Sequence, residues 1–163
     1  MMSLEEFDSV VEKKYETIQA SIDEEARKQR EVCEAFAEAV INLLGTLLTD
    51  TTRYGEKEIN LGISRELFGE YNVNQHSYAD RSLIEIQPDQ TVIKLTYAPF
   101  TRKRLPEEYD EHLVNELLSP YFITVKYNYD FGEEYDNGEL RITYNRSKRL
   151  AHRNNQNKNG RTR

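Results

Sequence analysis

The side chains that most often carry catalysis or bind metals are few in this chain of 163 residues, and they lie far apart. There is one cysteine, Cys33, and there are three histidines, His76, His112 and His152. No histidine is next to the cysteine or four residues from another histidine, which are spacings that metal and nucleophile motifs use. We therefore predict no catalytic residue, no metal site and no bound cofactor, and we expect a protein that is not an enzyme.

One short pattern fits a magnesium-dependent nuclease. Such enzymes hold the cation with a carboxylate followed by a strand that carries Glu-x-Lys or Glu-x-Gln. The segment Glu85-Ile86-Gln87 has this spacing, with Asp80 and Asp89 close by. A strand with one outward glutamate before a turn gives the same pattern, and we favour that interpretation. The 7 glycines form no phosphate-binding loop of the Walker or dinucleotide type.

The segment 66–82 has the densest mixture of Asn, Gln, His, Tyr, Asp and Arg in the chain. Long polar loops often carry functional side chains. His76, Tyr78, Asp80 and Arg81 are therefore candidates for an acid-base or recognition cluster. A sheet also needs a polar loop of this length to reach its next strand, and this is the commoner explanation.

Charge is divided among three blocks. Residues 1–50 contain 12 acids and 5 bases, residues 51–145 contain 17 acids and 10 bases, and residues 146–163 contain 7 bases and no acid. Two blocks of -7 leave -14 on residues 1–145, and the last block adds +7. We divide the chain at the same boundaries into a long amphipathic helix (1–50), an α+β sheet domain (51–145) and a basic tail (146–163).

The basic tail has one leucine and one alanine as its only hydrophobic residues, so we expect it to be flexible and disordered when unbound. Each Lys or Arg that neutralises a phosphate releases condensed counterions, which gives salt-dependent and sequence-independent affinity. One functional hypothesis is therefore a nucleic-acid-binding accessory protein. The alternative is a solubilising end that folds back loosely on the acidic body. The candidate phosphate contacts are Arg146, Lys148, Arg149, Arg153, Lys158, Arg161 and Arg163.

The first fifty residues predict one long helix. Ser3 and Glu6 have the Ser-x-x-Glu spacing of a capping box, so we expect the helix to begin there. Apolar residues then recur every three or four positions, except that polar Gln29 occupies one expected position, and no proline or glycine occurs before Gly45. At about 1.5 Å per residue such a helix is longer than the body of a domain of this size. Part of it must project from the body.

The two halves of this helix differ in composition. Residues 32–48 are dense in apolar side chains and suit packing on a sheet, whereas residues 23–31 include no large apolar side chain. The projecting half still carries an apolar stripe, which in water is usually covered by a partner helix. We therefore predict a homo-oligomer formed through a coiled coil or helix pair; the alternative is a helix bent near Ala26 that folds back on its own domain. The predicted self-association residues are Phe7, Val11, Tyr15, Ile18 and Ile22.

After residue 50 the periodicity changes from helical to alternating. Ile59, Leu61 and Ile63 predict a short strand, and the two alternating runs on either side of Pro88-Asp89-Gln90 predict a hairpin. Residues 105–119 return to helical spacing, with Pro106 suited to the first turn and Pro120 ending the helix. The fold class is therefore α+β: a long N-terminal helix followed by a mostly antiparallel sheet of about five strands, with a second helix inserted before the last hairpin.

The last hairpin has the clearest local signal. Asn137-Gly138 is the preferred pair for a two-residue type I′ turn, which would place Tyr135 opposite Leu140 and Glu133 opposite Ile142. The odd-numbered residues from 121 to 135 are almost all apolar or aromatic. We therefore expect these odd positions to face the core and the even positions to face solvent or a partner.

The tip of this hairpin combines tyrosines with carboxylates, a composition that suits a basic partner. The first functional hypothesis is a non-enzymatic interaction protein whose acidic body binds a basic macromolecule, as a regulator or inhibitor that competes with nucleic acid. Carboxylates that only keep an exposed hairpin soluble are the commoner case. The candidate partner-binding residues are Tyr129, Glu133, Glu134, Tyr135 and Asp136.

A single cysteine excludes an intramolecular disulfide, and the acidic N-terminus lacks the basic start and apolar core of a secretory signal. We expect a cytoplasmic protein with no membrane-spanning segment.

The predicted order of helix, three strands, helix and two strands is similar to that of small acidic dimeric secretion chaperones. This fold-level analogy implies an escort role as a third hypothesis, and the long first helix and basic tail depart from it.

Overall fold

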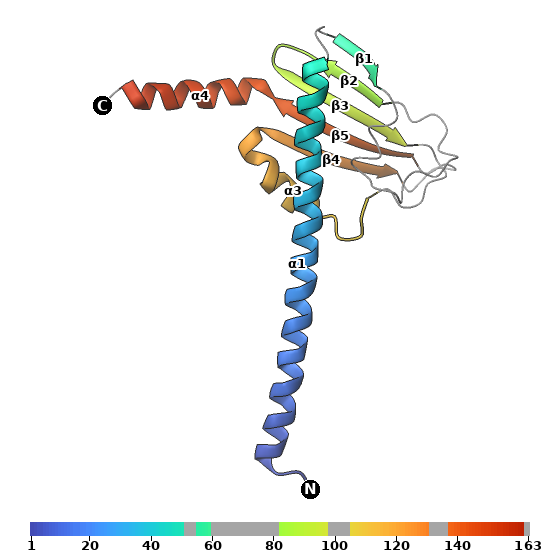
Figure 1. The fold of residues 1–163 in the computed structure, drawn as a ribbon, viewed down its shortest axis with the longest axis vertical. Coiled ribbons are helices and arrows are strands. Elements are labelled where there is room, and N and C mark those ends of the chain that lie inside the picture. The colour runs from blue at the N-terminus through green and yellow to red at the C-terminus, as the bar shows by residue number, and fades with distance from the viewer. Residues whose placement is uncertain (51–54, 60–81, 98–104, 131–136, 162–163) are drawn as a thin grey trace.

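The computed structural model describes residues 1–50, 55–59, 82–97, 105–130 and 137–161 (Figure 1). These residues confirm the α+β fold class: a long N-terminal helix, a five-stranded antiparallel sheet, and a second helix before the last two strands. The elements in chain order are α1 (Leu4–Asp50), β1 (Gly55–Ile59), β2 (Ser82–Ile86), β3 (Gln90–Tyr97), α3 (Glu111–Leu118), the 3-10 helix η2 (Ser119–Tyr121), β4 (Ile123–Asp130), β5 (Asn137–Asn145) and α4 (Arg146–Arg161).

Helix α1 begins with the predicted capping box. The backbone N–H of Ser3 donates to Glu6 Oε2 (3.2 Å), and the N–H of Glu6 donates to Ser3 Oγ (3.1 Å), so each side chain satisfies the other residue's free backbone donor. The helix then continues without a break to Asp50, and its N-terminal half projects away from the sheet (Figure 1). The alternative of a helix bent near Ala26 is therefore wrong.

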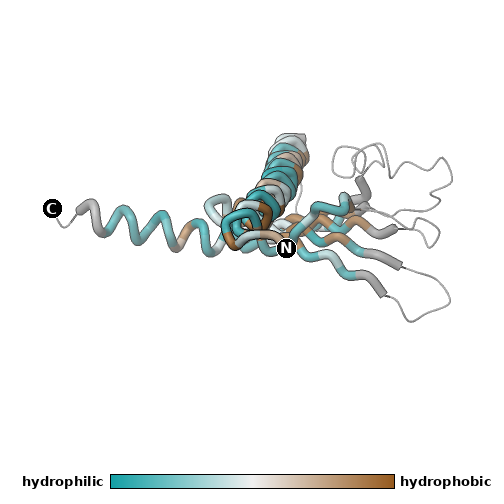
Figure 2. Tube along the Cα trace, turned by 90° about the horizontal axis from the view of Figure 1, so that it is seen from below, coloured by the Kyte–Doolittle hydropathy of each residue, from teal (hydrophilic) through white to brown (hydrophobic). Residues whose placement is uncertain are grey.

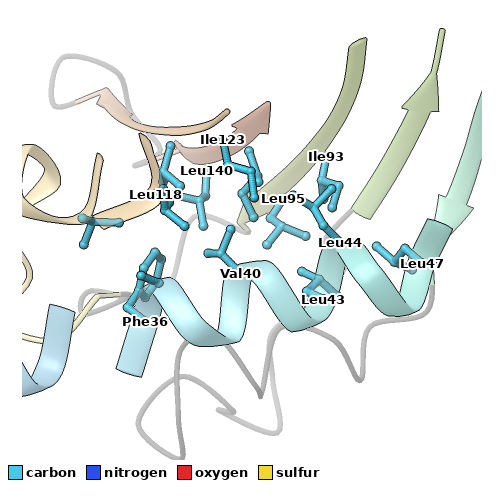
Figure 3. Close-up of a cluster of buried hydrophobic side chains, with 14 of the residues drawn as sticks. Phe36, Val40, Leu43, Leu44, Leu47, Ile93, Leu95, Leu118, Ile123 and Leu140 are labelled. Carbon is cyan, nitrogen blue, oxygen red and sulfur yellow. The ribbon is translucent and has the colours of Figure 1, made fainter. Parts of the chain in front are cut away.

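The C-terminal half of α1 supplies the core by packing on one face of the sheet (Figure 3). Val40, for example, is completely buried, as is Ile93 on the facing strand β3. Complete burial of a side chain of this size contributes roughly 1.5–3 kcal/mol. The residues of α1 in this core are Cys33, Phe36, Ala37, Val40, Leu43, Leu44 and Leu47, and those of the sheet are Ile84, Ile93, Leu95, Ile123, Val125, Leu140 and Ile142.

The strand order of the sheet is β1-β2-β3-β5-β4, and all neighbouring strands are antiparallel. The hairpin predicted around Pro88-Asp89 is confirmed, because β2 pairs with β3 and the N–H of Gln87 donates to the carbonyl of Gln90 (2.9 Å). The first strand lies slightly earlier than predicted and ends at Ile59. Leu61 and Ile63, which were part of that prediction, lie outside the described residues.

The predicted register of the last hairpin is wrong. Gly138 pairs with Tyr129, so the Asn137-Gly138 pair belongs to β5 and does not form a two-residue turn. Leu140 pairs with Tyr127, eight positions before the expected Tyr135. Because the shift is an even number of residues, the odd positions of β4 still face the core, as predicted.

Side-chain burial explains the shifted register. In the observed pairing Val125 lies opposite Ile142, and both are buried in the core. The predicted pairing would have placed Glu133 opposite Ile142 instead. Burial of an apolar cross-strand pair therefore outweighs the turn preference of Asn-Gly.

The start of α3 also differs from the prediction. The helix begins at Glu111 rather than near Pro106, because Asp110 caps it: Asp110 Oδ1 accepts from the N–H of Leu113 at 3.0 Å. The preceding residues form a turn in which the N–H of Tyr109 donates to the carbonyl of Pro106 (3.0 Å). A side-chain acceptor at the right distance determines where this helix begins.

Helix α3 covers the edge of the sheet formed by β4. Asn115 makes two hydrogen bonds to the outward backbone of Val125: its Nδ2 donates to the carbonyl (3.0 Å), and its Oδ1 accepts from the N–H (2.7 Å). Two residues further along β4, the N–H of Tyr127 donates to Glu111 Oε2 (3.1 Å). An edge strand with free backbone groups can pair with another chain, so these side chains also protect the fold from edge-to-edge association.

The tail was expected to be disordered, and that expectation is wrong for residues 146–161, which form α4. The helix follows β5 directly, and its first donors are satisfied: Asn145 Oδ1 accepts from the N–H of Lys148 (2.9 Å), and the carbonyl of Asp89 accepts from the N–H of Ser147 (3.1 Å). Low hydrophobicity predicts disorder for an isolated segment, but a helix that is capped and attached at one end needs less burial of its own.

One stretch of α1 is long and apolar enough to cross a membrane by length and composition alone. The core helix of a folded domain meets the same criteria, and in this fold Phe36, Val40 and Leu44 of α1 are buried against the sheet. The expected cytoplasmic location stays a prediction from the sequence.

The clamp between α3 and β4 can be tested with Asn115→Ala. This change removes the amide donor and acceptor that pair with the backbone of Val125, and it leaves the N–H and carbonyl of Val125 unsatisfied. We therefore expect the free energy of unfolding to fall by about 2–4 kcal/mol. Urea denaturation measures it. The matched control is Asn128→Ala on the exposed face of the same strand, which should change stability by less than about 0.5 kcal/mol. Equal stability of the two variants would contradict the clamp.

Candidate nucleic-acid interface

Helix α4 brings together six of the seven predicted phosphate contacts. Its side chains are exposed from Arg146 to Lys158 except for Leu150, and Figure 2 shows an almost wholly hydrophilic helix that extends away from the sheet. The helix contains no acidic residue. The contacts on α4 are Arg146, Lys148, Arg149, Arg153, Lys158 and Arg161; the side chain of Arg161 and the whole of Arg163 lie outside the described residues.

Phe122 attaches the first turns of α4 to the body. The guanidinium carbon of Arg149 lies 5.7 Å from the centroid of the Phe122 ring, and the imidazole of His152 lies 5.5 Å from it, centroid to centroid. Arg146 adds a hydrogen bond from Nη1 to the carbonyl of Pro88 (3.0 Å). His152, expected to be mobile, is therefore packed against the body.

Phe122 occupies an unfavourable backbone conformation. Its φ is 58° and its ψ is 33°, in the left-handed region, which costs a residue with a Cβ roughly 1–2 kcal/mol. This residue lies between η2 and β4, and its carbonyl accepts from the N–H of Asn145 at 2.9 Å. The same turn therefore places the aromatic ring against the first turns of α4. It also hydrogen-bonds to Asn145, the last residue of β5, directly before α4 begins. Nothing in the sequence around Phe122 indicates this role.

The cations of α4 repel one another. Arg146 and Arg149 are three residues apart, and Arg149 and Arg153 are four apart, which are the distances at which helical side chains are neighbours. Such like-charged pairs destabilise a helix by roughly 0.2–0.5 kcal/mol each, and cations in the first turn also oppose the helix dipole. Among the described residues, no salt bridge involves Lys148 or Arg153. An anion bound along α4 would relieve this repulsion.

A shallow groove of about 380 Å³ lies beside the first turn of α4. It is mostly apolar, and Arg149 is the cation on its wall. Tyr121, a side chain that is 52% exposed, forms part of the same wall. The full lining is Leu44, Leu48, Pro120, Tyr121, Ile123, Tyr144 and Arg149.

A second basic feature was missed in the sequence. Lys94 on β3 and Lys126 on β4 both pair with Arg141 on β5, so the three cations form a row on the sheet face opposite α1. Arg141 also contacts Glu139 at 3.2 Å. Alternation places each of these residues on the outer face, but only the observed register aligns them, and the register was predicted incorrectly.

The other sequence candidates do not form a site in the part of the chain that is described. Glu85 Oε1 accepts from Gln87 Nε2 at 3.3 Å, and no group of three or more His, Cys, Asp or Glu side chains converges among the described residues as a metal would require. His112 is exposed and lies 2.9 Å from Glu116 Oε1. Asp80 is outside the described residues. The nuclease pattern therefore gains no structural support here.

Two predicted clusters lie in segments that the structure does not describe. Tyr129 is part of β4, but its side chain is not described. The hypotheses of an acidic partner-binding tip and of a site in the polar loop therefore stay predictions. The residues outside the described ranges are Glu133, Glu134, Tyr135 and Asp136 of the tip and His76, Tyr78, Asp80 and Arg81 of the loop.

Cys33 is placed as a core residue. It is completely buried, and its Sγ lies 3.6 Å from the carbonyl of Glu108. Burial raises the pKa of the Cys33 thiol, so the reactive thiolate is disfavoured at neutral pH. The arrangement suits packing between α1 and the segment before α3 rather than nucleophilic chemistry.

The chain matches no protein family, no curated protein and no solved structure. Evidence about function therefore comes from the geometry and charge of α4 and its surroundings.

Tyr109 allows a test of the packing between α1 and α3. Its ring meets Phe36 edge to face at 5.0 Å, and its hydroxyl is buried without a hydrogen-bond partner among the described residues. Burial, with a smaller effect of Glu111, raises the pKa of Tyr109 above its ordinary value of 10.0. The neutral phenol is therefore favoured in the folded state, and stability is lost as the pH rises beyond the ordinary pKa, since the unfolded chain ionises first.

We expect Tyr109→Phe to raise the free energy of unfolding by about 1 kcal/mol at pH 7, because it removes an unsatisfied buried hydroxyl and keeps the ring. The loss of stability between pH 7 and pH 11 should also become smaller. Urea denaturation across this pH range measures both effects. Tyr121→Phe, a change at an exposed tyrosine, is the control and should alter neither. A destabilised Tyr109→Phe protein would show that the hydroxyl has a partner.

Proposed function

We propose that this protein binds nucleic acid through α4, with the phosphate backbone as the ligand. The observation that carries the proposal is a protruding helix with cations and no acid, attached to a body of opposite charge. Neutralisation of phosphates by Lys and Arg supplies sequence-independent affinity. The proposal adopts the accessory-protein hypothesis, since four of the five residues of the acidic-tip hypothesis lie outside the described part of the chain.

The dimensions and charge distribution of α4 support duplex DNA as the ligand. The cations lie on all sides of the helix: Arg146 and Arg153 share one face, and Lys148 lies on nearly the opposite face, as the rotation of about 100° per residue requires. A helix of this diameter enters the major groove of B-DNA, which has phosphates on both walls. Asn154, Asn155 and other amides in the second half of α4 add hydrogen-bonding groups for phosphates or base edges.

The position of α4 reduces the repulsion that the acidic body would exert on a bound nucleic acid. Residues 1–145 carry a net charge of -14, and phosphates would be repelled by that surface. Helix α4 extends away from both the sheet and the projecting half of α1 (Figures 1 and 2). At an ionic strength of 0.15 M, charges more than about 8 Å apart are largely screened. A phosphate near the outer turns of α4 therefore interacts mainly with the cations of the helix.

The test compares the full-length protein with the double variant Lys148→Gln/Arg153→Gln. Both side chains are exposed and contact neither Phe122 nor Pro88, so the attachment of α4 should persist. Fluorescence anisotropy with a labelled duplex of mixed sequence, measured over a salt series, should show weaker binding by the variant. Removal of two phosphate contacts should reduce the slope of log Kobs against log[salt] by about 1.8.

The charge-matched control is Lys13→Gln/Lys28→Gln, which removes two exposed cations from α1 and should leave the affinity and the salt slope unchanged. Equal loss in the two double variants would mean that only the total charge matters. Absence of duplex binding by the unmodified protein at low salt would reject the proposal.

A further inference from the structure

The projecting half of α1 carries an apolar stripe that the body leaves in solvent. Leu4 is 74% exposed, Tyr15 65% and Ile22 52%, and Figure 1 shows this half of the helix clear of the sheet. Exposed apolar rows of this kind mark interaction surfaces. We call it the N-terminal stripe, and it consists of Leu4, Phe7, Val11, Tyr15, Ile18 and Ile22.

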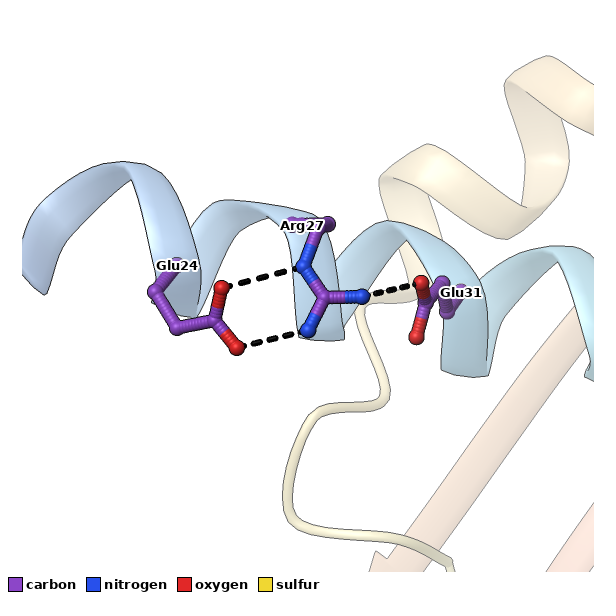
Figure 4. Close-up of polar contacts among 3 residues, drawn as sticks. All are labelled: Glu24, Arg27 and Glu31. Carbon is purple, nitrogen blue, oxygen red and sulfur yellow. Dashed lines mark hydrogen bonds and ion pairs between the residues drawn. The ribbon is translucent and has the colours of Figure 1, made fainter. Parts of the chain in front are cut away.

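The stripe is held away from the core of its own chain by a polar spacer, residues 23–31. In the spacer Arg27 bridges two carboxylates, Glu24 at 2.6 Å and Glu31 at 2.5 Å (Figure 4). The hydrogen bonds from Arg27 lower the pKa of Glu24 below its ordinary value. Ile22 and Cys33 are 11 positions apart, which is roughly 16 Å along the helix. No described residue of the body covers the stripe, which leaves it open to another molecule.

The spacing of the stripe indicates that its occupant is another helix. The steps Leu4, Phe7, Val11 are repeated 11 residues later as Tyr15, Ile18, Ile22. An 11-residue repeat has about 3.67 residues per turn, close to the 3.6 of an unstrained helix, so the stripe runs almost straight along one face. A second copy of this chain presents a stripe of identical length and period.

The charges beside the stripe favour one orientation of the second copy. At about 100° per residue, one flank carries four acids and no base over residues 4–23, and the opposite flank carries no acid. Two antiparallel helices place like flanks together, so acid would face acid along the contact. Two parallel helices place opposite flanks together. The acidic flank is Glu5, Asp8, Glu12 and Asp23; the opposite flank is Val10, Lys14, Thr17 and Ser21.

We propose that this chain forms a parallel homodimer through the N-terminal stripe, with Lys14 of each copy beside the acidic flank of the other. Both sheet domains then lie at the same end of the paired helices. The proposal depends on α1 alone and not on the nucleic-acid function of α4.

The first experiment measures mass by light scattering after size exclusion. The full-length chain has a mass of 19.2 kDa, and the protein should elute with twice that mass at micromolar concentrations and above. Ile18→Asp/Ile22→Asp should halve the measured mass. The control Ser9→Asp/Ala20→Asp adds the same charge on the opposite, exposed face and should leave the mass doubled. Circular dichroism checks that α1 stays helical in both variants. A monomeric unmodified protein, or the same mass for both variants, would overturn the stripe as the interface.

The second experiment determines the orientation by disulfide crosslinking under mild oxidation. Leu4→Cys and Ile22→Cys place a thiol at either end of the stripe, 18 positions apart on the same face of α1. In a parallel dimer each variant crosslinks to itself. In an antiparallel dimer neither does so, but a mixture of the two variants crosslinks. The unmodified protein is the control, since its one cysteine, Cys33, is buried. Crosslinking confined to the mixture would overturn the parallel arrangement.

Discussion

The packing of the C-terminal half of α1 on one face of the sheet is the constraint on which the rest of the structure depends. It buries Val40 and the strand residues Ile93 and Ile142 almost completely. A five-stranded sheet with one apolar face is not stable in water until another element covers that face, and α1 contributes more of the buried core residues than α3 does. Because the buried residues of α1 begin at Cys33, the N-terminal half of the helix can project from the body as a straight extension.

The sequence predicts well where side-chain periodicity alone decides the structure. The capping box at Ser3, the helical apolar spacing and the absence of proline and glycine before Gly45 predicted α1 almost to the residue, because a long helix is a local structure. The β2–β3 hairpin was also predicted correctly. Its strands follow each other closely, and a turn at Pro88-Asp89 leaves little choice of register.

Prediction failed where a distant contact competed with a local preference. Asn137-Gly138 favours a tight turn, but pairing Val125 with Ile142 buries more apolar surface. For α4, low hydrophobicity incorrectly predicted disorder. What composition could not reveal was the anchor: Phe122 lies more than twenty residues before the helix, and its strained backbone is recognisable only once β4 and β5 are paired. The basic row across β3, β5 and β4 was missed for the same reason, since it exists only in the observed register.

The arrangement of charge follows from the same architecture. Cations attached directly to the body would be neutralised by the acids of residues 1–145, and a flexible basic tail could fold back on them with little loss. A helix attached through Asn145 and Phe122 cannot do so, because its direction is determined where it leaves the sheet. On the projecting half of α1, the acids beside the stripe lie on one flank only. In the proposed dimer this distribution favours parallel over antiparallel pairing of the two helices. In a parallel dimer both copies of α4 would leave from the same end of the paired α1 helices, so the element that buries the core also determines how the basic helices are presented.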